Sequence, residues 1–480
     1  MIAKRFSSKS FYKLMLAVMI GLFCCLVDKT ILYIALSIGI YFISFYLLYL
    51  STRTLNLITP AYLYFFFYTI YFYIWAVFIV ARGKSYRIGE VVISGPGYDL
   101  ILAATLGILC FSFGVLLSSS FLRFRPLKEL LLFRQRKWLN DLQGTPFNIA
   151  ISLLVLLSLS LAITFFVKQG IPILAYTEAL GSDSFFGKMG EARINAQRGA
   201  GYFMQGITLM LPFCTLVLYA KGLLEEQRIW KLWAFLITTL TIVMMISLTS
   251  RGHFAIFLVL LFLLHQLLTK QVNWKKAGFF FSLFFVLFVG ASIFKMGYFL
   301  TIENVPELLI DTFDIFTHRL SMGAQQFHAM LQIFPEPNPF LFGVSYIWDI
   351  KGILPGPDIG FNAWVFTLIY PFRMVGSNVT PLSIGEFYAN FGWPGIIMGS
   401  FLLGLLLQTI YIRFIRSQGK ISHLVAFVVF STYIAKSSMN GLGAIISEPI
   451  ISMAGSYFLL ITMLGFFRRT TKEYLCPKPC

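Results

Sequence analysis

Acidic residues are scarce in this sequence. The chain of 480 residues contains 20 Asp and Glu against 38 Lys and Arg, and charged residues of both signs make up only 12% of it. Soluble globular proteins contain about 25% charged residues, so the composition excludes that class. Hydrophobic residues make up 58% of the chain, and apolar runs of about 20 residues recur throughout. The sequence therefore predicts an all-α polytopic membrane protein.

Apolar stretches long enough to cross about 30 Å of hydrocarbon predict about 12 transmembrane helices. They lie near residues 11–27, 30–50, 59–81, 99–122, 148–167, 202–220, 233–249, 253–269, 277–298, 393–412, 423–440 and 449–467. The first stretch is expected to be a retained helix, because no small-residue cleavage site follows it. Residues 1–480 are expected to form a single integral membrane domain.

The distribution of Lys and Arg predicts the orientation of the chain. When the N-terminus is placed inside, most of the 38 basic residues fall in segments on the inner side, where short basic loops remain in membrane proteins. Both termini are therefore expected to be cytoplasmic. The net charge of +18 reports this topology, and no nucleic-acid partner is needed to explain it.

Cysteine and histidine are also rare, with 6 and 5 copies. No cysteine lies in a predicted outer loop, so disulfides are not expected to brace the exposed part of the chain. The outer loops contain neither a DxD-like acidic pair nor a close set of His, Asp and Glu at metal-ligand spacing. No metal and no other cofactor is expected.

Two predicted outer loops are longer than a connection requires. The first covers residues 168–201. The second covers residues 299–392, contains an expected helix at 311–334, and is then rich in Pro, Gly and aromatic residues. A loop of this composition is too apolar to be a free linker. We expect it to pack over the outer face of the helix bundle and to enclose a site there.

The second loop ends in the stretch TPLSIGEFYANFGWPGIIMGS, residues 380–400. Its glycines and Pro394 are expected to let the chain turn closely into the tenth span. Glu386 is a candidate general base, and Asn390, one helical turn later, is a candidate sugar ligand. The alternative for Glu386 is a structural role, for example as a carboxylate at a helix N-terminus.

Among the arginines on the predicted outer side, which run against the general charge bias, three are placed so that they are candidates for a site. Arg193 precedes a span, Arg251 lies in a tight turn between two spans, and Arg319 lies in the expected loop helix. Arg319, Gly323 and Gln326 share one stripe of that helix, while His318, Ser321, Gln325 and His328 share another. The alternatives are interfacial snorkelling for Arg193 and Arg251 and a solvated helix face for Arg319.

Two further residues are candidates. His318 is a second candidate base, because its ordinary pKa is about 6.5, and the alternative is an exposed helix residue. Lys436 is a costly charge inside the eleventh span and a secondary site candidate, and the alternative is pairing with Glu448 or a carbonyl group. The residues do not decide between Glu386 and His318.

Four features together resemble a known family. They are GIPIL followed by an arginine in a short outer loop, a TSRG turn between two spans, HRL in a large outer loop, and TPLSIGEFYANFGWPG entering the next span. In this order the chain resembles the Wzy-type O-antigen polymerases, also called oligosaccharide repeat unit polymerases. The resemblance covers roughly residues 165–410.

The resemblance implies a metal-independent, GT-C-like glycosyltransferase in the bacterial inner membrane. Such an enzyme moves a growing glycan from undecaprenyl diphosphate to the non-reducing end of a new lipid-linked repeat unit. By resemblance, Arg193, Arg251 and Arg319 line the diphosphate, with Arg373 a further candidate. The implied partners are undecaprenyl-diphosphate-linked oligosaccharides, membrane lipid and a chain-length regulator in the same membrane.

Two other functions stay open at this point. An O-antigen ligase shares the implied fold type and donor but delivers the finished glycan to a lipid A core. A lipid-oligosaccharide flippase also has about 12 spans, although transporters usually show two repeated halves and no repeat is visible in this sequence. The GEFYANFG ending and the GIPIL loop favour the polymerase.

Overall fold

The computed structural model describes residues 29–53, 59–126, 129, 141–171, 201–225, 227–248, 251–269, 278, 282, 305–351, 360–372, 379–417, 419–445 and 451–475. These ranges are nearly all helical, with one short antiparallel hairpin. The predicted span at 11–27 lies outside them, as does nearly all of the span at 277–298.

Eight helices in the described ranges are long and apolar enough to cross a membrane. They are Lys29–Thr52, Pro60–Arg82, Tyr98–Phe121, Thr145–Gln169, Phe203–Leu224, Arg228–Ser247, Gly252–Thr269 and Leu382–Arg416. Each coincides with a predicted span, and two shorter apolar helices, Ile421–Lys436 and Met453–Phe467, fall on the last two. The prediction of an all-α polytopic membrane protein is confirmed, while the total of about 12 spans and the GT-C architecture stay predictions.

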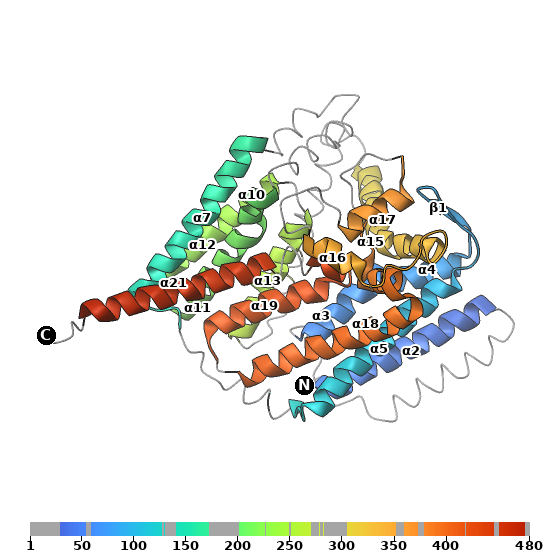
Figure 1. Ribbon diagram of the computed structural model, residues 1–480, viewed down its shortest axis with the longest axis horizontal. Helices are drawn as coiled ribbons and strands as arrows, with labels where there is room; N and C mark the ends of the chain where they lie inside the picture. Colours follow the sequence, from blue (N-terminus) through green and yellow to red (C-terminus); the bar gives the residue numbers. More distant parts are fainter. Residues whose placement is uncertain are drawn as a thin grey trace. The chain divides into compact units, whose positions relative to one another are not determined.

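The helices and the two short strands follow in chain order, and Figure 1 labels most of them. The first group consists of α2 (Lys29–Thr52), α3 (Pro60–Tyr68), the π-helical η1 (Thr69–Tyr73), α4 (Ile74–Arg82), β1 (Tyr86–Ile88), β2 (Val91–Ile93) and α5 (Tyr98–Phe121). The second consists of α7 (Thr145–Gln169), α10 (Gly201–Gln205), the π-helical η2 (Gly206–Met210), α11 (Leu211–Leu224), α12 (Arg228–Ser247) and α13 (Arg251–Thr269). The third consists of α15 (Val305–Ile333), α16 (Val344–Lys351), α17 (Phe361–Ile369), α18 (Leu382–Arg416), α19 (Ile421–Lys436), α20 (Leu442–Ile445) and α21 (Ile451–Leu475).

The chain divides into two compact units, each assembled from segments far apart in sequence. Unit 1 comprises Met1–Gln135, Phe316–Ser417 and Ser431–Glu448. Unit 2 comprises Arg136–Ile315, Gln418–Phe430 and Pro449–Cys480. The candidate residues Glu386, Asn390 and Lys436 all belong to unit 1.

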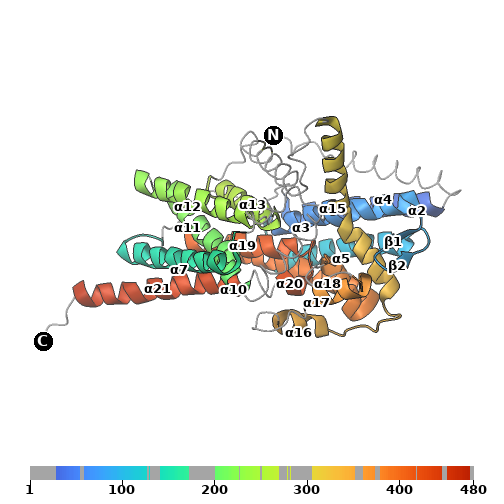
Figure 2. The same cartoon turned by 90° about the horizontal axis from the view of Figure 1, so that it is seen from above.

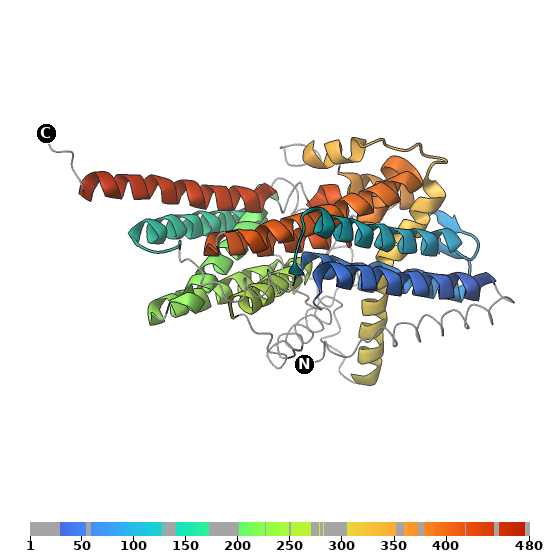
Figure 3. The same ribbon diagram turned by 90° about the horizontal axis from the view of Figure 1, so that it is seen from below.

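Unit 1 is built around a close contact between α5 and α18. A Cβ atom on Gly404 would overlap the carbonyl group of Phe111, and one on Gly114 would overlap the carbonyl group of Phe401. The two backbones therefore touch, as small residues allow between membrane helices. In Figures 1 and 3, α5 runs between α18 on one side and α2 on the other.

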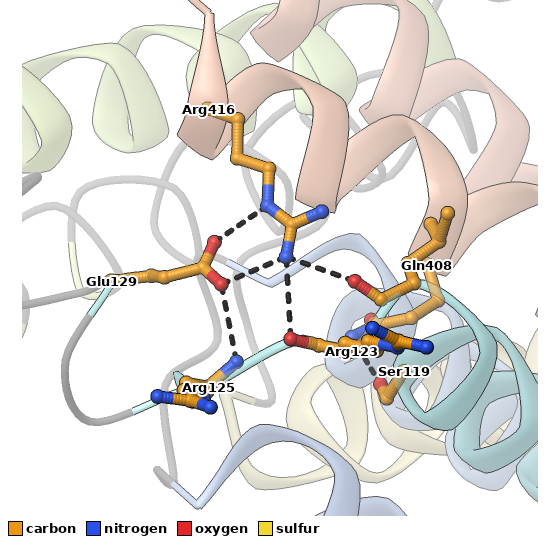
Figure 4. Close-up of polar contacts among 7 residues, drawn as sticks. Ser119, Arg123, Arg125, Glu129, Gln408 and Arg416 are labelled. Atoms are coloured by element: carbon orange, nitrogen blue, oxygen red, sulfur yellow. Dashed lines mark hydrogen bonds and ion pairs between the residues drawn. The ribbon is translucent and has the colours of Figure 1, made fainter.

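Polar side chains join the same two helices. The hydroxyl groups of Ser118 and Thr409 lie 2.9 Å apart, and the Gln408 amide donates to Ser119 Oγ at 2.8 Å (Figure 4). Such bonds hold transmembrane helices together, since an isolated polar group in hydrocarbon is costly. They set the register of α18 against α5.

Helix α18 bends sharply near its start. Gly392 has φ of 63° and ψ of −147° inside the element, a left-handed conformation that glycine adopts readily. Pro394 follows within the element and lacks the backbone N–H that a straight helix would use. The predicted turn is confirmed, but the stretch before it, Leu382–Phe391, is helical as well.

An ion pair ties the far end of α18 to the segment that follows α5. Arg416 donates to both carboxylate oxygens of Glu129 at 2.8 Å and to the carbonyl oxygen of Leu122 at 2.9 Å (Figure 4). The bidentate bond from Arg416 holds the pKa of the Glu129 carboxyl group below its ordinary value, and the backbone N–H of Arg125 acts in the same direction. The clamp fixes the C-terminus of α18 on the chain that leaves α5.

Unit 2 is a set of packed helices in which α7 lies beside α21 and α11 beside α12 (Figures 1 and 2). Its α19 segment is capped by a residue from a distant loop, because Asp141 accepts the N–H groups of Ile421 at 3.1 Å and of Ser422 at 3.3 Å. The Ser422 hydroxyl donates to the same carboxylate. A carboxylate at this position is favoured by the helix dipole.

The helix that was predicted to end near residue 220 extends further and includes Lys221. Helix α11 continues to Leu224, and Lys221 is 2% exposed. Its ammonium group lies 3.7 Å from the centre of the Trp230 ring, donates to Asn148 Oδ1 at 3.2 Å and is 3.7 Å from Glu225. The charge is held by a ring and polar partners inside unit 2.

The lowered pKa of Glu129 predicts that the stability of the fold depends on pH. Since its folded-state pKa lies below the ordinary value of 4.5, the ion pair stabilises the fold above pH 4.5, and this contribution is lost as the pH falls through the lowered pKa. For a partly exposed pair we expect about 0.2 to 1 kcal/mol. Thermal unfolding in detergent at neutral pH and at about pH 3 should show a larger acid-induced loss for wild type than for Glu129→Gln. Equal losses would contradict the assignment, and the exposed Glu336→Gln serves as the control.

Candidate functional site

The first turns of α18 carry the candidate residues Glu386 and Asn390 on one helical face, because four residues separate them. That face points into unit 1, and both residues are 0% exposed. Helices α16 and α20, both labelled in Figure 2, contact α18. Glu386 and Asn390, which the sequence places at the end of the second outer loop, therefore form part of a buried polar centre.

The Glu386 carboxylate is satisfied by groups from two other segments. Ser345 on α16 donates to Oε1 at 3.2 Å, and the backbone N–H of Gly443 on α20 donates to Oε2 at 3.0 Å. The N–H group of Leu442 also reaches the carboxylate. Glu386 thus accepts backbone N–H groups from the first residues of α20 rather than lying at the start of its own helix.

A second carboxylate faces the same place. Asp349 follows Ser345 by one turn of α16, is 5% exposed, and accepts the N–H group of Phe361 at 2.9 Å. A Cβ atom on Gly443 would overlap Asp349 Oδ2 and lie 2.8 Å from Glu386 Oε1. Glycine at 443 therefore lets both carboxylates approach one stretch of backbone.

Tyr346 on α16 adjoins this pair of acids. Burial, together with the negative charges of Glu386 and Asp349, raises the pKa of its phenol above the ordinary value of 10. The phenol is therefore neutral and able to donate a hydrogen bond at physiological pH. The centre combines two carboxylates with hydroxyl groups from a serine and a tyrosine.

Asn390 supports this centre through its amide group. Its Nδ2 donates to Ser345 Oγ at 2.7 Å and to the Glu386 carbonyl oxygen at 2.8 Å, while its Oδ1 accepts the Gly343 N–H at 2.8 Å. Both ends of the amide are used inside the protein. In this arrangement Asn390 orients Ser345, which in turn bonds to Glu386.

The expected loop helix at 311–334 is present as α15, and one of its stripes packs against the start of α18. Gln326 is 2% exposed and accepts from the N–H of Thr380 at 2.7 Å. A Cβ atom on Gly323 would come within 2.8 Å of Leu382. The part of the stripe formed by Gly323 and Gln326 is therefore not a solvated face.

His328, on the second stripe of α15, is buried and contacts the β-hairpin, so its role is structural. It is 2% exposed, and its Nδ1 lies 2.8 Å from the Tyr86 hydroxyl on β1. Burial lowers the pKa of His328 to about 4, so the ring is neutral at physiological pH. It joins α15 to the hairpin.

The other candidates are placed only in part. His318 and Arg319 lie in α15, and Arg251 is the first residue of α13, but the side chains of all three lie outside the described residues. Arg193 and Arg373 lie outside them altogether. Their convergence on a diphosphate stays a prediction.

Lys436 is described, and its position differs from the expected one. The predicted span ran to residue 440, whereas α19 ends at Lys436, so this lysine stands in the last helical turn, where a positive charge is favoured. Its ammonium group lies 5.8 Å from the centre of the Tyr433 ring. The next residue, Ser437, accepts the Ser383 N–H with its carbonyl oxygen at 2.9 Å, which brings the end of α19 to the start of α18.

Sequence reasoning missed Ser345, Tyr346, Asp349 and Gly443 as members of the centre. A partial signal exists, because Ser345 and Asp349 are four residues apart in a short apolar segment and share a helical face. Nothing in the pattern of NGLGA indicates that its backbone lies over Glu386. Within the described ranges, no group of three or more His, Cys, Asp or Glu side chains is gathered as a metal site would need.

Replacing Asn390 tests whether this amide holds the centre together. Asn390→Ala leaves the N–H group of Gly343 and the hydroxyl of Ser345 without their partner, which we expect to cost about 1 to 3 kcal/mol of stability. Thermal unfolding of the full chain in detergent should show a clear loss. The exposed Gln332→Ala on α15 is the control and should match wild type. An unchanged unfolding temperature for Asn390→Ala would contradict the supporting role.

Comparison with known proteins adds no family assignment. No protein-family model, curated protein sequence or solved structure matches this chain. The findings therefore support a membrane-embedded multi-pass protein with a buried pair of carboxylates, and its chemistry has to be proposed from the site and from the resemblance of its sequence motifs.

Proposed function

We propose that this chain is a glycosyltransferase that polymerises lipid-linked oligosaccharide repeat units at the periplasmic face of the bacterial inner membrane. It would transfer the growing glycan from undecaprenyl diphosphate to the non-reducing end of a new undecaprenyl-diphosphate-linked unit. The observation that supports this most is the buried centre of Glu386 and Asp349. Its Glu386 belongs to the motif that carries the family resemblance and lies on an element that continues into a membrane-length helix, while Asp349 is contributed by α16.

The reaction requires a base beside the acceptor sugar. The acceptor hydroxyl oxygen attacks the anomeric carbon, the bond from that carbon to the diphosphate breaks, and the diphosphate leaves with the electron pair. A base within hydrogen-bond reach takes the hydroxyl proton. Glu386 is the proposed base, with His318 as its rival. Ser345 and Gly443 each donate to one oxygen of the Glu386 carboxylate. Because an ionised carboxylate has about four lone-pair sites, the acceptor hydroxyl can donate to it beside these groups.

The leaving diphosphate requires positive charge. Arg193, Arg251 and Arg319 are the proposed ligands, with Arg373 as a further one, since the planar guanidinium fork matches phosphate oxygens. A preorganised donor of this kind is worth about 3 to 4 kcal/mol of barrier. Asn390 acts in this proposal by orienting Ser345 and Glu386, and Lys436 stays a secondary candidate for substrate contact.

Deleting the gene separates this function from its two alternatives. A polymerase predicts that the surface glycan loses its ladder on a gel and that the core carries a single repeat unit. Long polymer retained on the carrier lipid with bare core would instead identify a ligase. Single units trapped on the cytoplasmic side would identify a flippase. Restoration of the ladder by the plasmid-borne gene is the control.

Two variants decide between the proposed bases in the complemented strain. Glu386→Gln keeps the size of the side chain but removes the base, so we expect turnover to fall by about 10²-fold or more and the ladder to disappear at normal protein level. His318→Ala should keep the ladder. The reverse pattern would assign the base to His318. Glu336→Gln, an exposed glutamate in the same predicted loop, should behave as wild type.

A further inference from the structure

Asn362 on α17 carries a buried side-chain oxygen that no described residue contacts through a hydrogen bond. Its Oδ1 is shielded from solvent and has no hydrogen-bond partner among the described residues. An unsatisfied buried acceptor destabilises a fold, and in a native structure it calls for an explanation such as a ligand. Asn362 is not a residue that the sequence motifs indicate.

The position of Asn362 connects it with Glu386. Asp349 holds the start of α17 by accepting the Phe361 N–H at 2.9 Å, and Asn362 is the next residue. A Cβ atom on Gly441 would lie 3.2 Å from Asn362 Oδ1 and 2.9 Å from Glu386 Oε2. The two oxygen atoms therefore face the same point from two different helices.

The side chains around Gly441 and Gly443 present mainly hydrogen-bond acceptors. Glu386 and Asp349 are acceptors when ionised, and Asn362 presents its carbonyl oxygen. A ligand that satisfies such a group has to donate hydrogen bonds, which sugar hydroxyl groups do. Adjacent hydroxyls of one sugar ring can then donate to Asn362 and give a proton to Glu386.

We propose that Asn362 binds a hydroxyl group of the acceptor sugar beside Glu386. This inference rests on the proposed polymerase function. Asn362 is a substrate-binding residue in this scheme, and Asp349 is a positioning residue that sets the start of α17. Loss of Asn362 weakens acceptor binding and leaves the chemical step largely intact.

The test measures acceptor kinetics with the purified full-length chain in detergent. Lipid-linked single units extracted from the deletion strain serve as donor. Oligosaccharide released from them by mild acid and labelled at its reducing end serves as acceptor. Asn362→Leu, which matches the size of Asn but lacks the oxygen, should raise the acceptor KM about tenfold with kcat within about twofold. Asn362→Ser keeps an oxygen on a shorter side chain, so its acceptor KM should lie between those of wild type and Asn362→Leu.

Three outcomes overturn the inference. One is an acceptor KM of Asn362→Leu within about twofold of wild type, and another is a lower kcat at unchanged KM. The third applies if Asn362→Leu fails to fold: the inference is then overturned if Asn362→Ser folds stably and has the same acceptor KM as wild type. Thr367→Ala, an exposed position on the same helix, is the control. If wild type itself forms no polymer from these substrates, the proposed function fails, which is distinguishable from a wild-type enzyme that polymerises without needing Asn362.

Discussion

The close contact between the backbones of α5 and α18 is the constraint on which unit 1 depends. Only glycine at positions 114 and 404 lets the two helices approach this far, and hydroxyl and amide bonds between them set the register. In a membrane, association of helices relies on such packing rather than on the hydrophobic effect. Once α18 is seated on α5, the bend at Gly392 directs its first turns away from the straight path of the helix.

The first turns of α18 then bind two short helices, α16 and α20, which would not be stable by themselves. Helices α16 and α20 have 8 and 4 residues, lengths at which an isolated helix is not stable in water. They are held by polar bonds, in which Glu386 joins Ser345 to Gly443 and Asn390 joins Ser345 to Gly343. The same carboxylate that is proposed to act on the substrate therefore also organises the segments around it. This dual use explains why a structural and a catalytic role for Glu386 need not exclude each other.

Much of the fold could be predicted from the sequence, because hydrocarbon requires long apolar helices. All eight membrane-length helices among the described residues coincide with predicted spans, and α15 covers the helix expected at 311–334. The turn before the tenth span also followed from Gly392 and Pro394. Two span ends differ from their predicted positions, because α11 continues past residue 220 to Leu224 and α19 ends at Lys436 rather than near residue 440.

By itself the sequence determined the membrane class, the positions of the eight membrane-length helices in the described ranges and the presence of a carboxylate at position 386, since these depend on local composition and periodicity. Only the tertiary structure decided that Glu386 is buried and which groups face it. Two of its hydrogen-bond donors, Ser345 and Gly443, lie 41 and 57 residues away along the chain. Asp349 approaches it from the same helix as Ser345, and Asn362 approaches it from α17. Helical periodicity says which residues share a face, but it does not say which faces meet. That choice was made by the packing of α18 on α5 and by the bend at Gly392.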